Sequence, residues 1–538
     1  TGANLTSIDL TSAHLPGADM SGADLTGADL QEAILSGASL KNSILSGADL
    51  TRANLTGADL SRVNLTNANM TNANLANACM RGASLSGAFL SGASLTGADL
   101  SGANLTETDL SYADLTGANL FDTDLSYADL TLAYLTTAVL SGASLSGANL
   151  TRADLTGADL SNTDLTRVDL KSVSLTRADL RNSKLTGMDL TEVNLTDVKL
   201  SGADLTGADL TGADLAGMDL TGTDLSSANL TDVDVSGADL TGANLKAATL
   251  FGAVLKNSNF TNAILSDTDL RSVILTGVDL SGADLRNVNL TGVELSGTNL
   301  EGGNLVGANL SNGDLYGANL SGADLSGANL SGADLSGADL TGADLTGADV
   351  TRVNLMGAIL SDTDFTGANL TGAALSDRDL TGANLTGAAL AASDLRNVNL
   401  TGMDLSGADL SDANLTDTNL SGVNLTNSKL SGADLLHTDL SGAKLIGANL
   451  TGANLTGANL MGADVSHTDL TDVNLTDVNL TDVRLSDVNL SGMNLSGVKM
   501  NNADLVNVSL TGANLTDASL AGADLTDVDL SGADLSGA

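Results

Sequence analysis

The sequence predicts an all-β solenoid, a chain that coils so that each turn pairs with the next one. First, an apolar residue recurs at every fifth position, without a change of phase, through all 538 residues. Second, two apolar residues in each five-residue unit flank a polar one, which is the alternation of a short β-strand. Third, the other two residues are most often Ser or Thr followed by Gly, a pair typical of turns.

The fifth position of this unit, counted in pentads from Thr1, is Leu in all but nine of 107 pentads. The nine exceptions are also apolar: Met20, Met70, Met80, Val235, Phe260, Val350, Phe365, Val465 and Met500. A period of five would carry these side chains around the whole surface of an α-helix, which excludes a helix. A three-residue strand needs neighbours above and below, and coiling supplies them. The period alone leaves open how many pentads form one coil.

The motif Ala-Asp/Asn-Leu-x-Gly covers essentially the whole chain, for example in the pentad frame Ala323–Gly327. It resembles the repeat of the pentapeptide-repeat family. The resemblance implies a right-handed quadrilateral β-helix with four pentapeptides per coil and with Leu and Ala facing inward. Twenty residues per coil imply about 27 coils and, at ~4.8 Å per strand layer, a rod of roughly 130 Å. Because the phase never shifts, we expect residues 1–538 to form a single uninterrupted solenoid with no linker or cap.

The composition restricts the function. The net charge of −43 argues against partners that need a basic surface, namely nucleic acid and anionic lipid. No apolar run has membrane-spanning length, so we expect no membrane insertion. The acidity favours solubility, cation binding or a high-salt habitat. Disorder is the weaker interpretation, because the 42% of hydrophobic residues occupy fixed positions.

The polar fourth position is mostly Asp or Asn, and residues twenty apart should stack in columns. Basic residues that interrupt such columns predict ion pairs between coils. The predicted pairs are Lys184 with Asp164 and Asp204, Lys199 with Asp179 and Asp219, and Arg484 with Asp464 and Asp504. Arg378 occupies an inward third position, where an unpaired charge is costly. There we expect a local bulge, a side chain that reaches outward, or an error in the sequence itself.

Catalytic and metal-binding chemistry has little support. His14, His437 and His467 lie far apart along the chain, whereas a metal site needs converging ligands. Ser, His and Asp occur without a cleft, and the Gly pattern matches no phosphate-binding loop. We therefore predict no enzyme activity and no cofactor. Columns of Asp could hold Ca²⁺, but diffuse counterions around a solvated acidic face are the favoured interpretation.

Outward apolar residues are the main candidates for contact surfaces. They form two groups in the sequence: Tyr112, Phe121, Tyr127, Leu132, Tyr134 and Val139, then Phe251, Val254, Ile264 and Ile274. Tolerated drift in a long repeat explains them equally well. The first and last pentads are ordinary repeats, and an uncapped solenoid exposes unpaired strand edges. Either the protein continues beyond this segment or subunits stack end to end.

These observations favour a structural role over a chemical one. The preferred hypothesis is a rigid acidic rod that assembles end to end as a homo-oligomer into an extracellular or cell-surface filament, with the cytoplasm as the other location. The resemblance implies an alternative, an acidic DNA mimic that acts on a type II topoisomerase. A third hypothesis, ice binding through Thr/Ser ladders, ranks lower because Thr and Ser occur on all sides.

Overall fold

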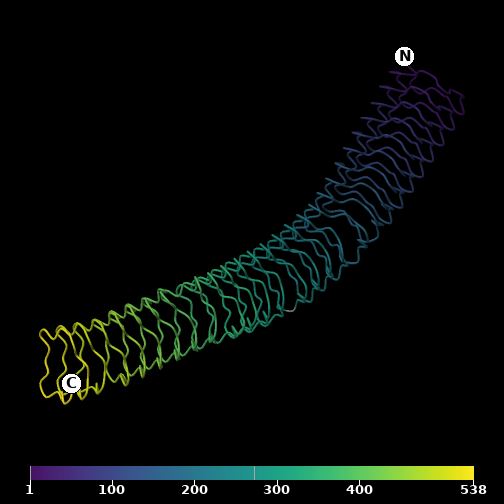
Figure 1. Ribbon diagram of the computed structural model, residues 1–538. Helices are drawn as coiled ribbons and strands as arrows, with labels where there is room; N and C mark the ends of the chain where they lie inside the picture. The colour runs from purple at the N-terminus through teal and green to yellow at the C-terminus, as the bar shows by residue number, and fades with distance from the viewer. Residues whose placement is uncertain (1, 272) are drawn as a thin grey trace. The chain divides into compact units, whose positions relative to one another are not determined.

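The computed structural model describes residues 2–271 and 273–538. Over these residues the secondary structure consists of single-residue β-bridges separated by two-residue turns, and it includes no helix. Each bridge lies at the fourth position of a pentad, and each turn occupies the first and second positions. All the bridges, from Asn4↔Asp24 to Asn514↔Asp534, are parallel and join residues twenty apart. The chain is therefore an all-β solenoid whose successive coils lie side by side (Figure 1).

The chain divides into two compact units. The first comprises Thr1–Thr268 with Ser272–Ile274, and the second comprises Asp269–Arg271 with Leu275–Ala538. The phase of the repeat gives no sign of this division, because the pentads run through it without insertion or deletion.

Hydrogen bonds explain why five residues make a complete unit. Three backbone N–H groups of a pentad donate to neighbouring coils, one closes the turn, and one donates to a side chain. In pentad 326–330 these bonds are Gly327 N–H to Thr346 O (2.9 Å), Asn329 N–H to Ala308 O (2.9 Å), Leu330 N–H to Asp349 O (2.7 Å), Ala328 N–H to Leu325 O (2.9 Å) and Ser326 N–H to Asp324 Oδ1 (3.0 Å). Every backbone donor of this pentad is thus satisfied, as buried backbone requires.

The turn at positions one and two has a left-handed residue at position two in nearly every pentad. Gly327 has φ +63°, and Asp477 has φ +58°. With the bond from position three back to the preceding position five, this is a type II turn, which requires a positive φ at its third residue. Gly adopts this conformation without steric cost, and Asn and Asp tolerate it better than most residues.

The core is formed by the third and fifth positions. Leu325 and Ala323 are almost completely buried, as are the equivalent residues of most coils. Where Ser or Thr replaces Ala, the hydroxyl usually donates to a backbone carbonyl, for example from Thr123 to Leu120 O at 2.6 Å. Burial of these hydroxyls therefore leaves few donors without a partner.

Large side chains at the third position disturb the pairing. Among the described position-four residues, three take no part in any bridge: Asp169, Asn194 and Asp379. The residues before them are Val168, Val193 and Arg378, in place of the usual Ala. The third position lies in the core, where a larger side chain needs more room than Ala. A larger side chain does not always break the ladder, because the residues after Val63 and Val233 keep their bridges to both neighbouring coils.

Arg378 disrupts its coil as the sequence predicts. Its side chain is partly buried, and its Nε–H donates to Ser376 O at 3.0 Å, in the turn outside the core. Asp379, the next residue, leaves the bridge ladder. The guanidinium thus reaches toward the corner of the coil, and the local pairing is lost.

Candidate interaction surfaces

The residue at the fourth position holds the following turn by hydrogen bonds, in addition to making the surface acidic. Its carboxylate or amide Oδ1 accepts the N–H two residues later, and often also the hydroxyl of that residue. Asp339 accepts the Thr341 N–H at 2.9 Å and the Thr341 hydroxyl at 2.6 Å. This Asx turn explains why Asp and Asn both serve here, since each offers Oδ1. The expectation of a simply outward residue is incomplete, because most position-four residues are only partly exposed.

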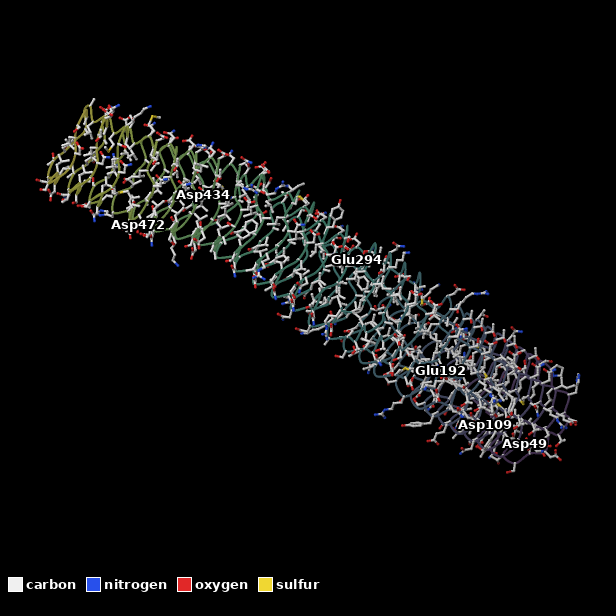
Figure 2. The ribbon with its side chains drawn as sticks, turned by 90° about the horizontal axis from the view of Figure 1, so that it is seen from below. Asp49, Asp109, Glu192, Glu294, Asp434 and Asp472 are labelled. Carbon is white, nitrogen blue, oxygen red and sulfur yellow. The ribbon has the colours of Figure 1, made fainter. Side chains whose placement is uncertain are left out.

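The same kind of contact lowers the pKa of several of these aspartates, among them Asp334 and Asp219. The Ser336 hydroxyl and then the Ser336 N–H lower the pKa of Asp334 by hydrogen bonding to its charged form. Polar side-chain atoms cover the outside of the coils, and the labelled Asp and Glu residues are spread along both units (Figure 2). The acidic surface is therefore built from groups that also hold the turns.

The predicted ion pairs between coils form on one side only. Each of the three cations lies near the aspartate of the preceding coil: Lys184 Nζ to Asp164 at 3.7 Å, Lys199 Nζ to Asp179 at 3.7 Å, and Arg484 Nη1 to Asp464 at 3.8 Å. Within residues 2–271 and 273–538, none of them approaches the aspartate of the following coil, Asp204, Asp219 or Asp504, within 4.0 Å. The three cationic side chains are well exposed, so these ion pairs add little to the stability of the fold.

Sequence reasoning missed a second class of ion pair. The guanidinium of an Arg at position one pairs with the position-four Asp two residues earlier. The backbone N–H of the same Arg also donates a hydrogen bond to that carboxylate. The pairs, each 2.6 Å, are Arg181–Asp179, Arg271–Asp269, Arg286–Asp284 and Arg396–Asp394. The signal was the short motif Asp-Leu-Arg, which replaces the usual hydroxyl of the Asx turn by a guanidinium.

The first group of predicted apolar residues does not form one patch. Tyr112, Phe121, Tyr127 and Tyr134 are all exposed, and Leu132 and Val139 are partly exposed. In the twenty-residue register, Leu132 follows Tyr112 in one column and Tyr134 lies in the same pentad as Leu132. The other three occupy different columns. The structure therefore supports a small cluster of Tyr112, Leu132 and Tyr134.

The second group divides in the same way. Val254 and Ile274 form a bridge between adjacent coils, and Phe251 belongs to the pentad of Val254. Ile264 lies ten residues from both, half a coil away, and pairs with Asn244. Phe251 and Ile274 are exposed and Val254 is partly exposed, so these three form one apolar group, and Ile264 is separate from it.

A third apolar group, in the second unit, was missed. Tyr316 and Met356 are exposed and lie forty residues apart, hence in one column, and Ser336 between them is buried. Ile359, in the pentad of Met356, is also exposed. The signal was available in the sequence as apolar residues at a multiple of twenty.

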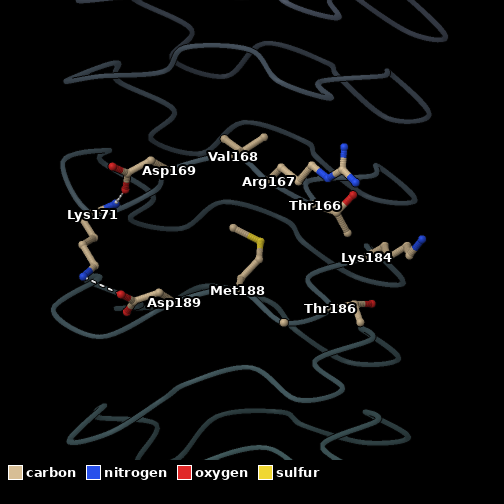
Figure 3. A pocket seen from close by; sticks show the side chains of 10 residues that line it. Thr166, Arg167, Val168, Asp169, Lys171, Lys184, Thr186, Met188 and Asp189 are labelled. Atoms are coloured by element: carbon tan, nitrogen blue, oxygen red, sulfur yellow. Dashed lines mark hydrogen bonds and ion pairs between the residues drawn. The ribbon is translucent and has the colours of Figure 1, made fainter.

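An open groove of about 650 Å³ lies between two coils of the first unit. Val168 and Met188 form its apolar floor, with Arg167 and Lys184 on one side and Lys171 on the other (Figure 3). Lys171 Nζ lies 2.6 Å from Asp189 Oδ2 across the gap between the coils. The Lys171 ammonium and then the Thr191 hydroxyl lower the pKa of Asp189 from 3.8 to about 2.

Two of the three histidines lie beside carboxylates of adjacent coils. His437 Nδ1 is 3.6 Å from Asp417, and His467 Nδ1 is 3.7 Å from Asp487. Among the residues that the structure describes, no three His, Cys, Asp or Glu side chains are placed to hold a metal ion. Nor do these residues include a helix with the length and apolar character of a membrane span.

Comparison with protein families decides the classification. The sequence matches the family described as pentapeptide repeats (8 copies) over residues 3–171 and 174–538. The chain belongs to the pentapeptide-repeat family. Its Ala-Asp/Asn-Leu-x-Gly motif, the buried Leu and the twenty-residue register are the features of this chain that agree with that membership. No curated protein sequence matches the chain.

Solved structures of this family resemble parts of the chain. HetL, a pentapeptide repeat protein involved in heterocyst differentiation regulation in the cyanobacterium Nostoc, is 30% identical, with 51% of this chain and 91% of HetL covered and a TM-score of 0.13. A pentapeptide repeat protein of the Arabidopsis thaliana thylakoid lumen is 35% identical over 17% of this chain and 68% of its own, with a TM-score of 0.15. QnrB1, a plasmid-mediated fluoroquinolone resistance protein, is 26% identical over 37% and 90%, with a TM-score of 0.15.

Proposed function

We propose that this pentapeptide-repeat protein is a non-catalytic structural scaffold that forms a filament. In the filament, the last coil of one copy stacks on the first coil of the next. The proposed coil is a right-handed quadrilateral of four pentapeptides, and 538 residues correspond to about 27 such coils. The observation that carries the proposal is the pairing of the coils. Each coil offers the next one the same row of groups, the N–H of positions two and five and the C=O of position three.

The same row of groups supports stacking between copies. A strand edge with free N–H and C=O groups is a template for another chain. Leu525 and Leu535 are 40% and 42% exposed in the last coil, whereas equivalent leucines in the interior are buried. A second copy that stacks there would bury these leucines and extend the ladder.

Electron microscopy and sedimentation of the full chain test this proposal. We expect filaments, and we expect the double substitution Leu525→Arg and Leu535→Arg to shorten or abolish them. Met461→Arg is the matched control, because Met461 is comparably exposed but lies on an interior coil. A monodisperse single-chain species at all concentrations, or filaments that survive the double substitution, would contradict end-to-end stacking.

The acidity favours a second candidate, an acidic DNA mimic that binds a type II topoisomerase. Aspartates repeat in columns, as in the bridges Asp324↔Asp344 and Asp344↔Asp364, and the net charge is −43. Rows of carboxylates can imitate the charge of a nucleic-acid backbone. A supercoiling assay with DNA gyrase tests this candidate, and unchanged enzyme activity at micromolar protein would exclude it.

A further inference from the structure

Four methionines at position three share a structural effect. They are Met188, Met218, Met403 and Met493. In each of these pentads, the residue after the methionine pairs with the following coil but not with the preceding one. Asp189, for example, pairs with Asp209, and the described chain has no bridge between Asp169 and Asp189. The equivalent missing bridges are 199↔219, 384↔404 and 474↔494.

Side-chain length accounts for this effect. The third-position residue twenty before the methionine is Val in three cases and Ala383 in the fourth, so methionine alone is sufficient. Val has this effect only at some positions: Asp234, which follows Val233, keeps its bridges to Asp214 and Val254, whereas Asp169 and Asn194, which follow Val168 and Val193, take part in none. All four third-position methionines, in contrast, coincide with a lost bridge to the preceding coil. Long methionine side chains therefore hold adjacent coils apart on one side. We call each such boundary, between a methionine pentad and the pentad twenty residues before it, a methionine seam.

The seams are open to solvent. The groove of about 650 Å³ is lined by Val168 and Met188, and a second groove of about 400 Å³ is lined by Val473 and Met493. Met218, Met403 and Met493 are partly exposed, and Met188 is 5% exposed at the floor of its groove. In contrast, the fifth-position methionines Met70, Met80 and Met500 are 0% exposed. The seam methionines are therefore more accessible to a small oxidant than Met70, Met80 and Met500.

We propose that the seam methionines are sites of reversible oxidation by hydroperoxides, and that their oxidation loosens the solenoid at these boundaries. The thioether sulfur attacks one oxygen of the hydroperoxide, the O–O bond breaks, and the sulfur gains an S=O bond. The sulfur loses two electrons, and the other oxygen leaves as water when the oxidant is H₂O₂. A thiol-dependent sulfoxide reductase reverses the change.

Oxidation changes what the seam contains. A sulfoxide is polar, so its transfer into an apolar floor such as that beside Val168 is unfavourable, and water follows it into the groove. At this seam the same two coils remain joined in the neighbouring pentad, by Leu165 N–H to Lys184 O (3.0 Å) and Lys184 N–H to Thr163 O (2.8 Å). We expect these two bonds to open more often once Met188 is oxidised.

Peptide mapping by mass spectrometry and hydrogen exchange on the full chain test the proposal, with H₂O₂ as the probe. We expect oxidation at the four seam methionines well before Met70, Met80 and Met500. We also expect several-fold faster exchange in peptides that contain Leu165 and Lys184, and recovery after treatment with sulfoxide reductase. Equal oxidation of seam and core methionines, or seam oxidation without a change in exchange, would overturn the proposal.

A matched variant separates the seams from general oxidative damage. The quadruple substitution Met188→Leu, Met218→Leu, Met403→Leu and Met493→Leu conserves volume and removes the oxidisable sulfurs. Met356 and Met461 remain as exposed controls outside the third position. The pentad of Met461 pairs with both neighbouring coils through Asp464, and that of Met356 pairs with the preceding coil through Ile359. We expect peroxide to oxidise Met356 and Met461 in the variant and to leave exchange unchanged. Faster exchange in the oxidised variant would assign the effect to other residues and refute the role of the seams.

Discussion

The ring of Tyr127 lies over Gly147, twenty residues later in the same column: a Cβ at Gly147 would be 2.8 Å from both Cδ1 and Cε1 of the ring. Asn182 covers Gly202 and His437 covers Gly457 in the same way. A side chain at position two therefore extends toward the following coil, and Gly at the next position two leaves room for it. The type of residue at one corner thus depends on the residue one coil earlier.

This dependence predicts that Gly147→Ala lowers the thermal midpoint more than Gly187→Ala does. Both glycines have a positive φ, +70° and +66°, so both substitutions incur a left-handed cost of roughly 1–2 kcal/mol. Only Gly147 has a ring within contact distance, since no atom lies within 4 Å of the Cβ position at Gly187. Adding Tyr127→Ser to Gly147→Ala should remove the difference, as calorimetry can show. Equal losses for the two alanines would contradict the steric account.

The Asx turn predicts a clear difference between two substitutions of Asp334. Its Oδ1 accepts the Ser336 N–H at 2.9 Å, the Ser336 hydroxyl at 2.6 Å and Asn354 Nδ2 at 2.9 Å. Asp334→Asn keeps an Oδ1 acceptor and should be nearly neutral at pH 7. Asp334→Ala leaves these donors without their acceptor and should destabilise the unit by about 1–3 kcal/mol. Chemical denaturation measures both variants, and equal stabilities would show that the turn does not need its side-chain acceptor.

The Lys171–Asp189 pair predicts acid sensitivity of the first unit. The folded pKa of Asp189, about 2, lies below its ordinary value of 3.8, so the folded state favours the charged carboxylate. This contribution is fully present above pH ~4 and is lost as the pH falls from there to about 2. Thermal midpoints measured across this range should fall less steeply for Asp189→Asn than for the parent protein. Lys171→Met should move the loss to higher pH, and unchanged acid profiles in both variants would contradict this assignment.

The unpartnered hydroxyl of buried Thr298 predicts that its replacement by an apolar residue stabilises the protein. It is 1% exposed, and its hydroxyl is the buried side-chain oxygen without a hydrogen-bond partner in the described part of the chain. Thr298→Val replaces that hydroxyl by a methyl group of similar size and should raise stability by about 1 kcal/mol. Thr123→Val is the control, because the Thr123 hydroxyl donates to Leu120 O at 2.6 Å, and it should lose stability. The same sign of change for both, measured by thermal unfolding, would contradict the prediction.

Arg378 predicts a second stabilising change. Arg378→Ala restores the usual third-position residue, so Asp379 should rejoin the ladder and the coil should exchange its amide hydrogens more slowly. Arg352→Ala is the control, because Arg352 lies at a corner, and its pentad already pairs on both sides through Asn354. Unchanged exchange around Asp379 in the Arg378 variant would show that another cause disrupts this coil.

The fold of the chain was predictable because one short rule governs it. The alternation around residues such as Asp324 shows which side chains face inward, and position five needs only an apolar group. The acceptor role of Asp324 was not predictable from this alternation, because a polar residue that faces water and one that closes an Asx turn look alike in sequence. The same limit applies to Met188, whose effect depends on its size relative to a neighbour in another coil.

The candidate surfaces were predictable in part. Val254 and Ile274 were placed in one column correctly, since only the register matters for them. Ile264 was grouped with them by closeness in sequence, although ten residues correspond to half a coil. The pair of Tyr316 and Met356 was missed because its members are far apart in the sequence. Forty residues correspond to two whole coils, so the two side chains lie in one column.

The twenty-residue register has a consequence for how such a chain can change in evolution. Insertion or deletion of twenty residues adds or removes one whole coil and leaves every later side chain in its column. Insertion of five residues keeps each Leu in the core but moves every later corner and surface residue to the adjacent column. A single duplicated pentad would then realign Asp164 with a new partner in place of Lys184, while the core composition stayed the same. Changes in length therefore preserve the surface columns only when they are multiples of twenty residues, whereas any multiple of five residues preserves the core.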